Sequence, residues 1–152
     1  MLNLVLYQPD IPQNLGALLR LSACMGVMVH IIEPCGFPMD DQKLRRAGMD
    51  YMHLARYLRH LNWDAFMAHR ATQPGRLLLL ETDGAVPYTQ IAFQPTDYVM
   101  VGRESAGTPA ELYPLMDQTV MIPMREGVRS LNVAMAAGMM VAEACRQMGW
   151  KF

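Results

Sequence analysis

The chain has 152 residues, 52% of them hydrophobic, and a formal net charge of −1. This length supports one proper hydrophobic core, so we expect a single domain over residues 1–152. The net charge argues against a strongly basic nucleic-acid binder, and the longest apolar runs, such as Leu77 to Leu80, are too short to span a bilayer.

Strands and helices are predicted to alternate along the first half of the chain. The short runs LNLVLY (residues 2–7) and VMVHII (27–32) are rich in apolar side chains, as buried parallel strands are. The helix predicted between them begins at Asn14, a good N-cap, and ends at Gly26, on the helical spacing of Leu15, Leu18, Leu19 and Ser22. Two shorter helices are predicted at DDQKLRRAG (40–48) and NWDAFMAHR (62–70).

The second half of the chain continues this alternation. Strands are predicted at RLLLL (76–80), YVMV (98–101) and TVMIP (119–123), and a helix that starts with proline at PAELYPLM (109–116). The longest helix is predicted over residues 130–148, with an apolar stripe formed by Leu131, Ala134, Met135, Gly138, Val141, Ala142 and Cys145. Strands separated by helices indicate an α/β fold built on a doubly wound parallel sheet.

The spacing of cysteines and histidines indicates neither a disulfide framework nor a metal site. The three cysteines are far apart, and none of the four histidines pairs with a cysteine or carboxylate at metal-ligand spacing. The residues after Met1 also lack a signal-peptide layout. We therefore expect a cytoplasmic protein that uses no metal and contacts no membrane.

Basic residues concentrate in one segment, although the whole chain is nearly neutral. Between residues 43 and 76 only Asp50 and Asp64 oppose the basic side chains Lys43, Arg45, Arg46, Arg56, Arg59, Arg70 and Arg76. This segment is a candidate phosphate-binding surface, and a solvated helical surface explains the charge equally well.

Polar loops that contain glycine follow two of the predicted strands. GRESAGTP (102–109) follows the fourth strand and REGVRSLN (125–132) follows the fifth. The turn after the first strand has prolines where a dinucleotide-binding protein would have GxGxxG, and no Walker A sequence occurs. Because ligands bind at the carboxyl ends of strands in open α/β sheets, we expect one ligand pocket built from these two loops.

Three short motifs occur in order along the chain. N-x5-R matches Asn14 and Arg20; G-x-E-x-x-G-x-P matches Gly102, Glu104, Gly107 and Pro109; I-P-M followed by S-L-N matches Ile122, Pro123, Ser130 and Asn132. In this order they resemble the SpoU branch of the SPOUT RNA methyltransferases, which are ribose 2′-O-methyltransferases. The segments LVLYQPDIPQN, HIIEPCGF and DDQKLRRAGMDY are further similar to short, single-domain tRNA wobble-position methyltransferases of the TrmL type.

This resemblance implies a SPOUT (α/β knot) fold with a C-terminal trefoil knot, and a homodimer with active sites at the interface. It implies S-adenosyl-L-methionine as the cofactor and the tRNA anticodon stem-loop as the partner. The implied reaction is methyl transfer to the ribose 2′-hydroxyl of wobble nucleotide 34, a cytidine or modified uridine, of leucine tRNAs. Two alternatives stay open: a SpoU-branch enzyme with another tRNA or ribosomal RNA target, and a non-catalytic adenosylmethionine- or RNA-binding module.

The resemblance also implies roles for individual residues. It assigns cofactor binding to Leu80, Gly102, Glu104, Gly107, Ile122, Ser130 and Leu131. It assigns catalysis to Arg20 together with Asn14, Glu104, Ser130 and Asn132. It assigns RNA contact to the basic residues of KLRRAG, which are Lys43, Arg45 and Arg46.

The catalytic residues each have a purely structural alternative. Arg20 stays protonated in proteins, so it suits phosphate binding or alkoxide stabilisation better than proton abstraction. Its structural alternative is an ion pair with Glu104. For Asn14, Ser130 and Asn132 the alternative is the capping of a helix.

Overall fold

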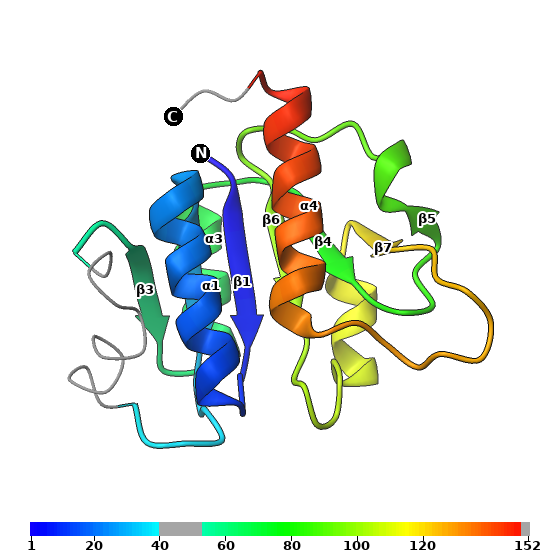
Figure 1. The fold of residues 1–152 in the computed structure, drawn as a ribbon. Helices are drawn as coiled ribbons and strands as arrows, with labels where there is room; N and C mark the ends of the chain where they lie inside the picture. Colours follow the sequence, from blue (N-terminus) through cyan, green and yellow to red (C-terminus); the bar gives the residue numbers. More distant parts are fainter. Residues whose placement is uncertain (40–52, 150–152) are drawn as a thin grey trace.

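The computed structural model describes residues 1–39 and 53–149, and at the centre of this part is a sheet of seven parallel strands (Figure 1). The strands are β1 (Asn3–Tyr7), β2 (Met28–Ile32), β3 (Arg56–His60), β4 (Leu77–Leu80), β5 (Val86–Pro87), β6 (Tyr98–Val101) and β7 (Gln118–Met121). Their order across the sheet is β3-β2-β1-β6-β4-β7-β5. β2 and β3 lie on one side of β1, and the strands that follow them in the chain, β4 to β7, lie on the other side. The boundary between β1 and β6 is thus the switch point at which open α/β sheets bind ligands.

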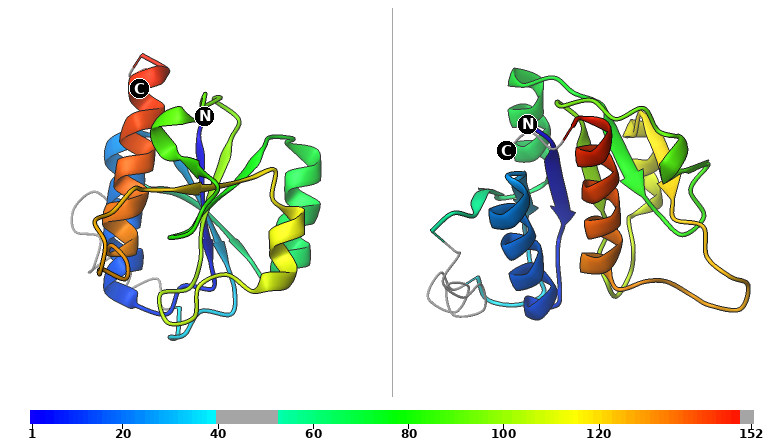
Figure 2. Two further views of the ribbon diagram at one scale, coloured as in Figure 1. Left: turned by 90° about the vertical axis from the view of Figure 1, so that its right-hand side faces the viewer. Right: turned by 45° about the horizontal axis from the view of Figure 1, so that its top comes forward.

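Helices cover both faces of the sheet and give the domain three layers (Figure 2). α1 (Pro12–Met25) and α4 (Val133–Gln147) pack against each other on one face, and the short 3-10 helix η2 (Tyr88–Gln90) contacts α4 there. α3 (Trp63–Thr72) and the 3-10 helix η3 (Ala110–Leu115) cover the other face. None of the helices in the described ranges combines the length and apolar character that a membrane span requires.

The buried strands supply side chains to both layers, because successive residues of a strand point to opposite faces. In β1, Leu4 and Leu6 pack in the core under α1 and α4. Val5 and Tyr7 pack in the core on the α3 side, which also contains Phe66. A sheet covered on both faces needs continuous apolar strands, and this requirement explains the unbroken apolar runs in the sequence.

The predicted fold class, a parallel sheet flanked by helices, is confirmed, and each of the five predicted strands is present with small shifts at its ends. The sequence did not predict β3 or β5. β3 (RYLRH) is a largely polar strand at the sheet edge, and β5 has only two residues. The trefoil knot implied by the resemblance stays a prediction.

The N-terminal boundary of α1 differs from the sequence prediction. α1 begins at Pro12 with Ile11 as its N-cap, so the predicted N-cap at Asn14 is wrong. Proline suits the first turn of a helix, and this earlier start places Asn14 inside α1 and buries it. The helix predicted at 62–70 is confirmed as α3, whereas the one at 109–116 is the 3-10 helix η3, which contains Pro114.

α4 also differs from its prediction, in its start and in the face that it buries. It begins at Val133 after the N-cap residue Asn132, which leaves Ser130 outside the helix. Leu131 and Met135, both in the predicted apolar stripe, are 37% and 63% exposed. The buried residues of α4 are Ala137, Met140, Val141, Ala144 and Cys145, so the prediction is confirmed for Val141 and Cys145.

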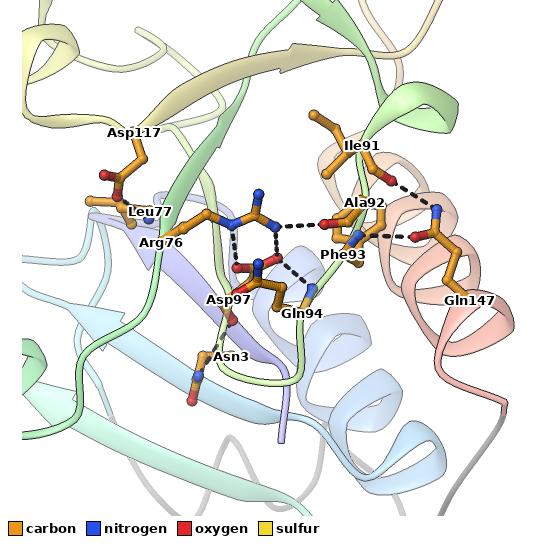
Figure 3. A network of polar contacts seen from close by, with 10 residues as sticks. All are labelled: Asn3, Arg76, Leu77, Ile91, Ala92, Phe93, Gln94, Asp97, Asp117 and Gln147. Atoms are coloured by element: carbon orange, nitrogen blue, oxygen red, sulfur yellow. Dashed lines mark hydrogen bonds and ion pairs between the residues drawn. The ribbon is translucent and has the colours of Figure 1, made fainter.

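An ion pair between the partly exposed Arg76 and the buried Asp97 holds the amino end of the sheet, away from the carboxyl ends of the strands (Figure 3). Arg76 donates from Nε and Nη2 to the two carboxylate oxygens of Asp97 at 2.9 and 2.7 Å. The Asp97 side chain is fully buried and also accepts the backbone N–H of Gln94 at 2.8 Å. The Asp97 carbonyl accepts the N–H of Asn3 at 2.9 Å, so this aspartate joins the starts of β1, β4 and β6.

Candidate functional site

A cavity of about 510 Å³ opens at the carboxyl ends of β4, β6 and β7. Its wall consists of residues at and directly after the ends of these strands, the segment that precedes α4, and the start of α1. This volume is in the usual range for small-molecule sites. The prediction that loops 102–109 and 125–132 contribute to one pocket is therefore confirmed.

Three side chains, one from each sequence motif, form a hydrogen-bond chain at the wall of this cavity. Asn132 donates from Nδ2 to Oδ1 of Asn14 at 2.9 Å, and Asn14 donates from Nδ2 to Oε1 of Glu104 at 3.1 Å. Oε2 of Glu104 accepts the backbone N–H of Asp10 at 3.0 Å. We call this chain of Asn132, Asn14 and Glu104 the relay. It connects the start of α4 and the first turn of α1 to the loop after β6.

The directions of the bonds in the relay follow from the capping of α4. Oδ1 of Asn132 accepts the backbone N–H groups of Ala134 and Met135 at 2.9 and 3.3 Å. The Asn132 amide nitrogen is therefore turned toward Asn14, whose oxygen accepts it and whose own nitrogen faces Glu104. A carboxylate is the matching acceptor at that end. Asn132 thus caps a helix and also belongs to the site.

Two carboxyl groups, Glu104 and Asp10, lie together at the end of the relay. Burial raises the pKa of Glu104, and a side-chain hydrogen bond with Asp10 raises it further. The same hydrogen bond is the main cause of the lowered pKa of Asp10, and a bond from Ser105 adds to it. Arg103 lies on the Asp10 side, with its Nε 3.7 Å from Oδ2. The pKa values of the two carboxyl groups are thus shifted in opposite directions, that of Glu104 upward and that of Asp10 downward.

The loop after β6 closes on itself at positions where glycine is required. Arg103 and Gly107 exchange backbone N–H···O bonds of 3.1 and 2.8 Å, and Gly107 has a φ of 67°. A Cβ added to Gly102 would lie 2.5 Å from Oγ1 of Thr108 and 2.7 Å from the carbonyl carbon of Gly107. A Cβ added to Gly107 would come no closer than 4.0 Å to its nearest neighbour, Oε1 of Glu81. Gly102 thus serves the packing of the loop, and Gly107 keeps the cavity wall bare.

The cofactor residues assigned from the sequence all line this one cavity; they are Leu80, Gly102, Glu104, Gly107, Ile122, Ser130 and Leu131. Leu80 and Ile122 are largely buried and present apolar walls, which suit the adenine ring. The loop from Gly102 to Gly107 presents bare backbone beside them. The residues present therefore fit the adenosylmethionine that the resemblance implies. Helix capping, the alternative for Ser130, is wrong, because Asn132 is the N-cap.

The catalytic arginine assigned from the sequence is not in the described cavity wall. Arg20 lies on α1 and is exposed to solvent. Its role in catalysis stays a prediction. The predicted RNA contacts Lys43, Arg45 and Arg46 lie outside the described residues, as does the helix predicted at 40–48.

Three other arginines of the basic segment are held in ion pairs. Arg59 contacts Glu33 at 2.9 Å, and Arg70 contacts Asp117 at 2.9 Å while it also donates to the carbonyl of Gly75. The third is Arg76, in the ion pair at the amino end of the sheet. Arg70 and Arg76 therefore stabilise the end of the sheet opposite the cavity.

Sequence reasoning missed several charged residues at the site. Glu81, Arg103 and Arg129 line the cavity, and Asp10 donates its backbone N–H to the relay. Each of them directly follows a predicted strand or lies in a loop already identified. Their position after a strand could therefore have indicated from the sequence that they belong to the site. Within residues 1–39 and 53–149, no group of three or more His, Cys, Asp or Glu side chains is arranged to hold a metal ion.

Comparison with known proteins gives concordant matches over nearly the whole chain. Residues 1–142 match the model of the SpoU rRNA Methylase family. A protein of Beijerinckia indica subsp. indica, named tRNA (cytidine(34)-2′-O)-methyltransferase, is 51% identical over 146 residues, which are 96% of this chain and 91% of that protein. A solved structure described by the words "Structural insights into the 2-OH methylation of C/U34 on tRNA" has a TM-score of 0.92 and 38% identity, and the match covers 99% of this chain and 98% of that one. AviRb, a SpoU methyltransferase from Streptomyces viridochromogenes in complex with the cofactor AdoMet, has a TM-score of 0.86 and 25% identity, with 98% of this chain and 61% of that chain covered.

Proposed function

The chain belongs to the SpoU methylase family, and on this basis we propose that it is an S-adenosylmethionine-dependent tRNA methyltransferase. Its proposed acceptor is the ribose 2′-hydroxyl of wobble nucleotide 34, a cytidine or modified uridine, in leucine tRNAs. The partner is the anticodon stem-loop, and the place of action is the cytoplasm.

The observation that carries this proposal is the relay. It joins one residue from each of the three motifs, Asn14, Glu104 and Asn132, at the wall of a cavity that fits the cofactor. A module that only bound adenosylmethionine would need the glycine loop and apolar walls but not this chain of polar side chains. Asn14 is buried, and a buried polar side chain costs stability unless it is paired, so its two relay partners favour an active site over a binding module.

The residues of the chain do most of their work by positioning. When bound, adenosylmethionine supplies an activated methyl group on its sulfonium. Leu80 and Ile122 would hold the adenine, and the relay fixes the loop after β6 against α1 and α4, which would keep the donor in line with the acceptor. Arg20 binds a phosphate next to the acceptor ribose and stabilises the developing alkoxide.

A homodimer explains how Arg20, which lies outside the cavity wall, serves the reaction. Met135 and Met139 on α4 and Leu131 just before it are 63%, 37% and 37% exposed. Exposed apolar side chains gathered on one helix face mark an interaction surface. α1, the helix that carries Arg20, packs against α4 on the same face of the sheet. We propose that the dimer forms through α4 and that Arg20 acts at the cavity of the other subunit.

The test uses radiolabelled adenosylmethionine and leucine tRNAs that carry a 2′-deoxy sugar at position 34 only. A matched substrate has the deoxy sugar at position 33, which leaves the acceptor hydroxyl in place. We expect label to enter the normal and the deoxy-33 tRNAs and to be absent from the deoxy-34 tRNA. Equal labelling of the deoxy-34 tRNA would show that another ribose is the acceptor.

A further inference from the structure

Glu81, the first residue after β4, has a carboxylate oxygen without a partner in the described chain. The residue lines the cavity, and its Oε1 is buried and accepts no hydrogen bond from residues 1–39 or 53–149. Nearly all buried polar atoms in proteins are hydrogen-bonded, and an unpaired acceptor destabilises the fold. A buried unpaired acceptor at a ligand cavity therefore indicates that the ligand supplies the donor.

The backbone N–H groups of Gly107 and of Glu81 itself are engaged in other bonds and do not serve Oε1. Gly107 faces it across the wall without a side chain, and the N–H of Gly107 is already bonded to the carbonyl of Arg103 at 2.8 Å. The backbone N–H of Glu81 itself donates to the carbonyl of Val120 at 2.9 Å. The Tyr113 hydroxyl is a neighbour of this carboxylate: burial raises the pKa of Tyr113, and the charges of Glu81 and Asp83 and a hydrogen bond with Glu81 raise it further.

The cofactor of the proposed function carries two kinds of donor that suit a carboxylate. These are the ribose hydroxyls and the α-ammonium of the methionyl group, and hydrogen bonds from either to an ionised acceptor are among the stronger ones in proteins. We propose that Glu81 is a cofactor-binding residue and that its Oε1 accepts a hydrogen bond from a hydroxyl or ammonium group of adenosylmethionine. This inference rests on the proposed function, and it concerns a residue outside the three motifs.

The test compares Glu81→Gln and Glu81→Met with Asp83→Asn in the absence of RNA. Asp83 lies two residues further along, is exposed and is not in the cavity wall. Asp83→Asn therefore makes the same charge change as Glu81→Gln at a position outside the cavity wall. By calorimetry, we expect adenosylmethionine to bind roughly 10-fold more weakly to Glu81→Gln and up to about 100-fold more weakly to Glu81→Met. Asp83→Asn is expected to bind it like the wild type.

A second readout separates cofactor binding from a purely structural role. A carboxylate kept for a ligand lowers the stability of the free protein, so Glu81→Gln without ligand is expected to melt at the same temperature as the wild type or higher. If the carboxylate instead stabilises the fold, Glu81→Gln without ligand is expected to melt at a lower temperature than the wild type. A lower melting temperature with unchanged affinity for adenosylmethionine would overturn the proposal.

Two related ligands identify the donor group. 5′-Methylthioadenosine keeps the ribose hydroxyls but lacks the amino acid, and S-adenosylhomocysteine keeps both donors but lacks the sulfonium charge. Weaker binding of all three ligands to Glu81→Gln assigns the ribose, and weaker binding of the two amino-acid ligands alone assigns the ammonium. Weaker binding of adenosylmethionine alone would mean attraction to the sulfonium, and would overturn the hydrogen bond.

The failure of this inference is distinct from the failure of the proposed function. If the wild type does not bind adenosylmethionine, the proposed function is wrong, and the role of Glu81 is wrong with it. If the wild type binds and both Glu81 variants bind equally well, only the role of Glu81 is wrong.

Discussion

Replacement of Asn14 by aspartate is expected to make the stability of the protein strongly dependent on pH. The change is isosteric, but it replaces the amide that donates to Glu104 with a further carboxylate, beside the one of Asp10. At the 3.1 Å separation of this bond, two full charges repel by about 5 kcal/mol at an effective dielectric constant of about 20. The folded protein avoids this repulsion if the pair keeps one proton, which restores a donor between the two oxygens.

The proton shared by the introduced carboxyl group and Glu104 sets the size and the sign of the change in stability with pH. In the unfolded chain the introduced carboxyl group would ionise with a pKa of about 4, so retention of the proton costs about 1.4 kcal/mol per pH unit above that value. At pH 7 this is about 4 kcal/mol, less than the repulsion, so the pair takes up the proton. The penalty falls to about 1.4 kcal/mol at pH 5 and disappears near pH 4, because the unfolded chain is then protonated as well.

The measurement is thermal unfolding of Asn14→Asp and wild type at pH 5, 6 and 7 and at one protein concentration. A loss of about 4 kcal/mol in a chain of this length lowers the melting temperature by roughly 8–16 °C at pH 7, and by much less at pH 5. Gln13→Glu is the matched control, because it makes the same change at the adjacent, exposed position of α1. A melting difference for Asn14→Asp that stays constant from pH 5 to 7 would refute the bond between Asn14 and Glu104.

Four further changes test other parts of the structure. Gly102→Val is expected to displace the loop that a Cβ would strike and so to weaken adenosylmethionine binding in calorimetry; unchanged affinity would contradict this. Arg20→Ala is expected to abolish methyl transfer but to leave cofactor affinity within about 2-fold of wild type; a large loss of affinity would place Arg20 on the cofactor side. Met135→Glu is expected to turn the proposed dimer into a monomer of 17.1 kDa in sedimentation, and a wild type that is already monomeric at micromolar concentration would rule the dimer out. Asp97→Ala is expected to lower the free energy of unfolding by about 3 kcal/mol in urea, because Arg76 loses its buried partner; a loss below about 1 kcal/mol would show that the pair does not hold the sheet.

The sequence by itself determined the central strands and the loops that build the cavity. Leu77 to Leu80 and Tyr98 to Val101 are apolar at every position, and a strand covered on both faces has no other pattern available. Loops 102–109 and 125–132 follow predicted strands, and the parallel arrangement of those strands is enough to bring them to one edge of the sheet. The three motifs then indicated the family.

Only the tertiary structure decided which side chains meet and which faces are buried. The polar strand β3 forms by pairing with β2, a contact that its own residues do not reveal. His30 and His60, 30 residues apart, lie in contact at 3.0 Å between ring nitrogens, and burial first, then the two neighbouring histidines, lower the pKa of His30 to about 4. Asn14 appeared to be a helix cap because local spacing suggested it, but its partners lie 90 and 118 residues away in the chain. Hydrogen bonds over such separations depend on how the loops pack, and local preferences do not encode that packing.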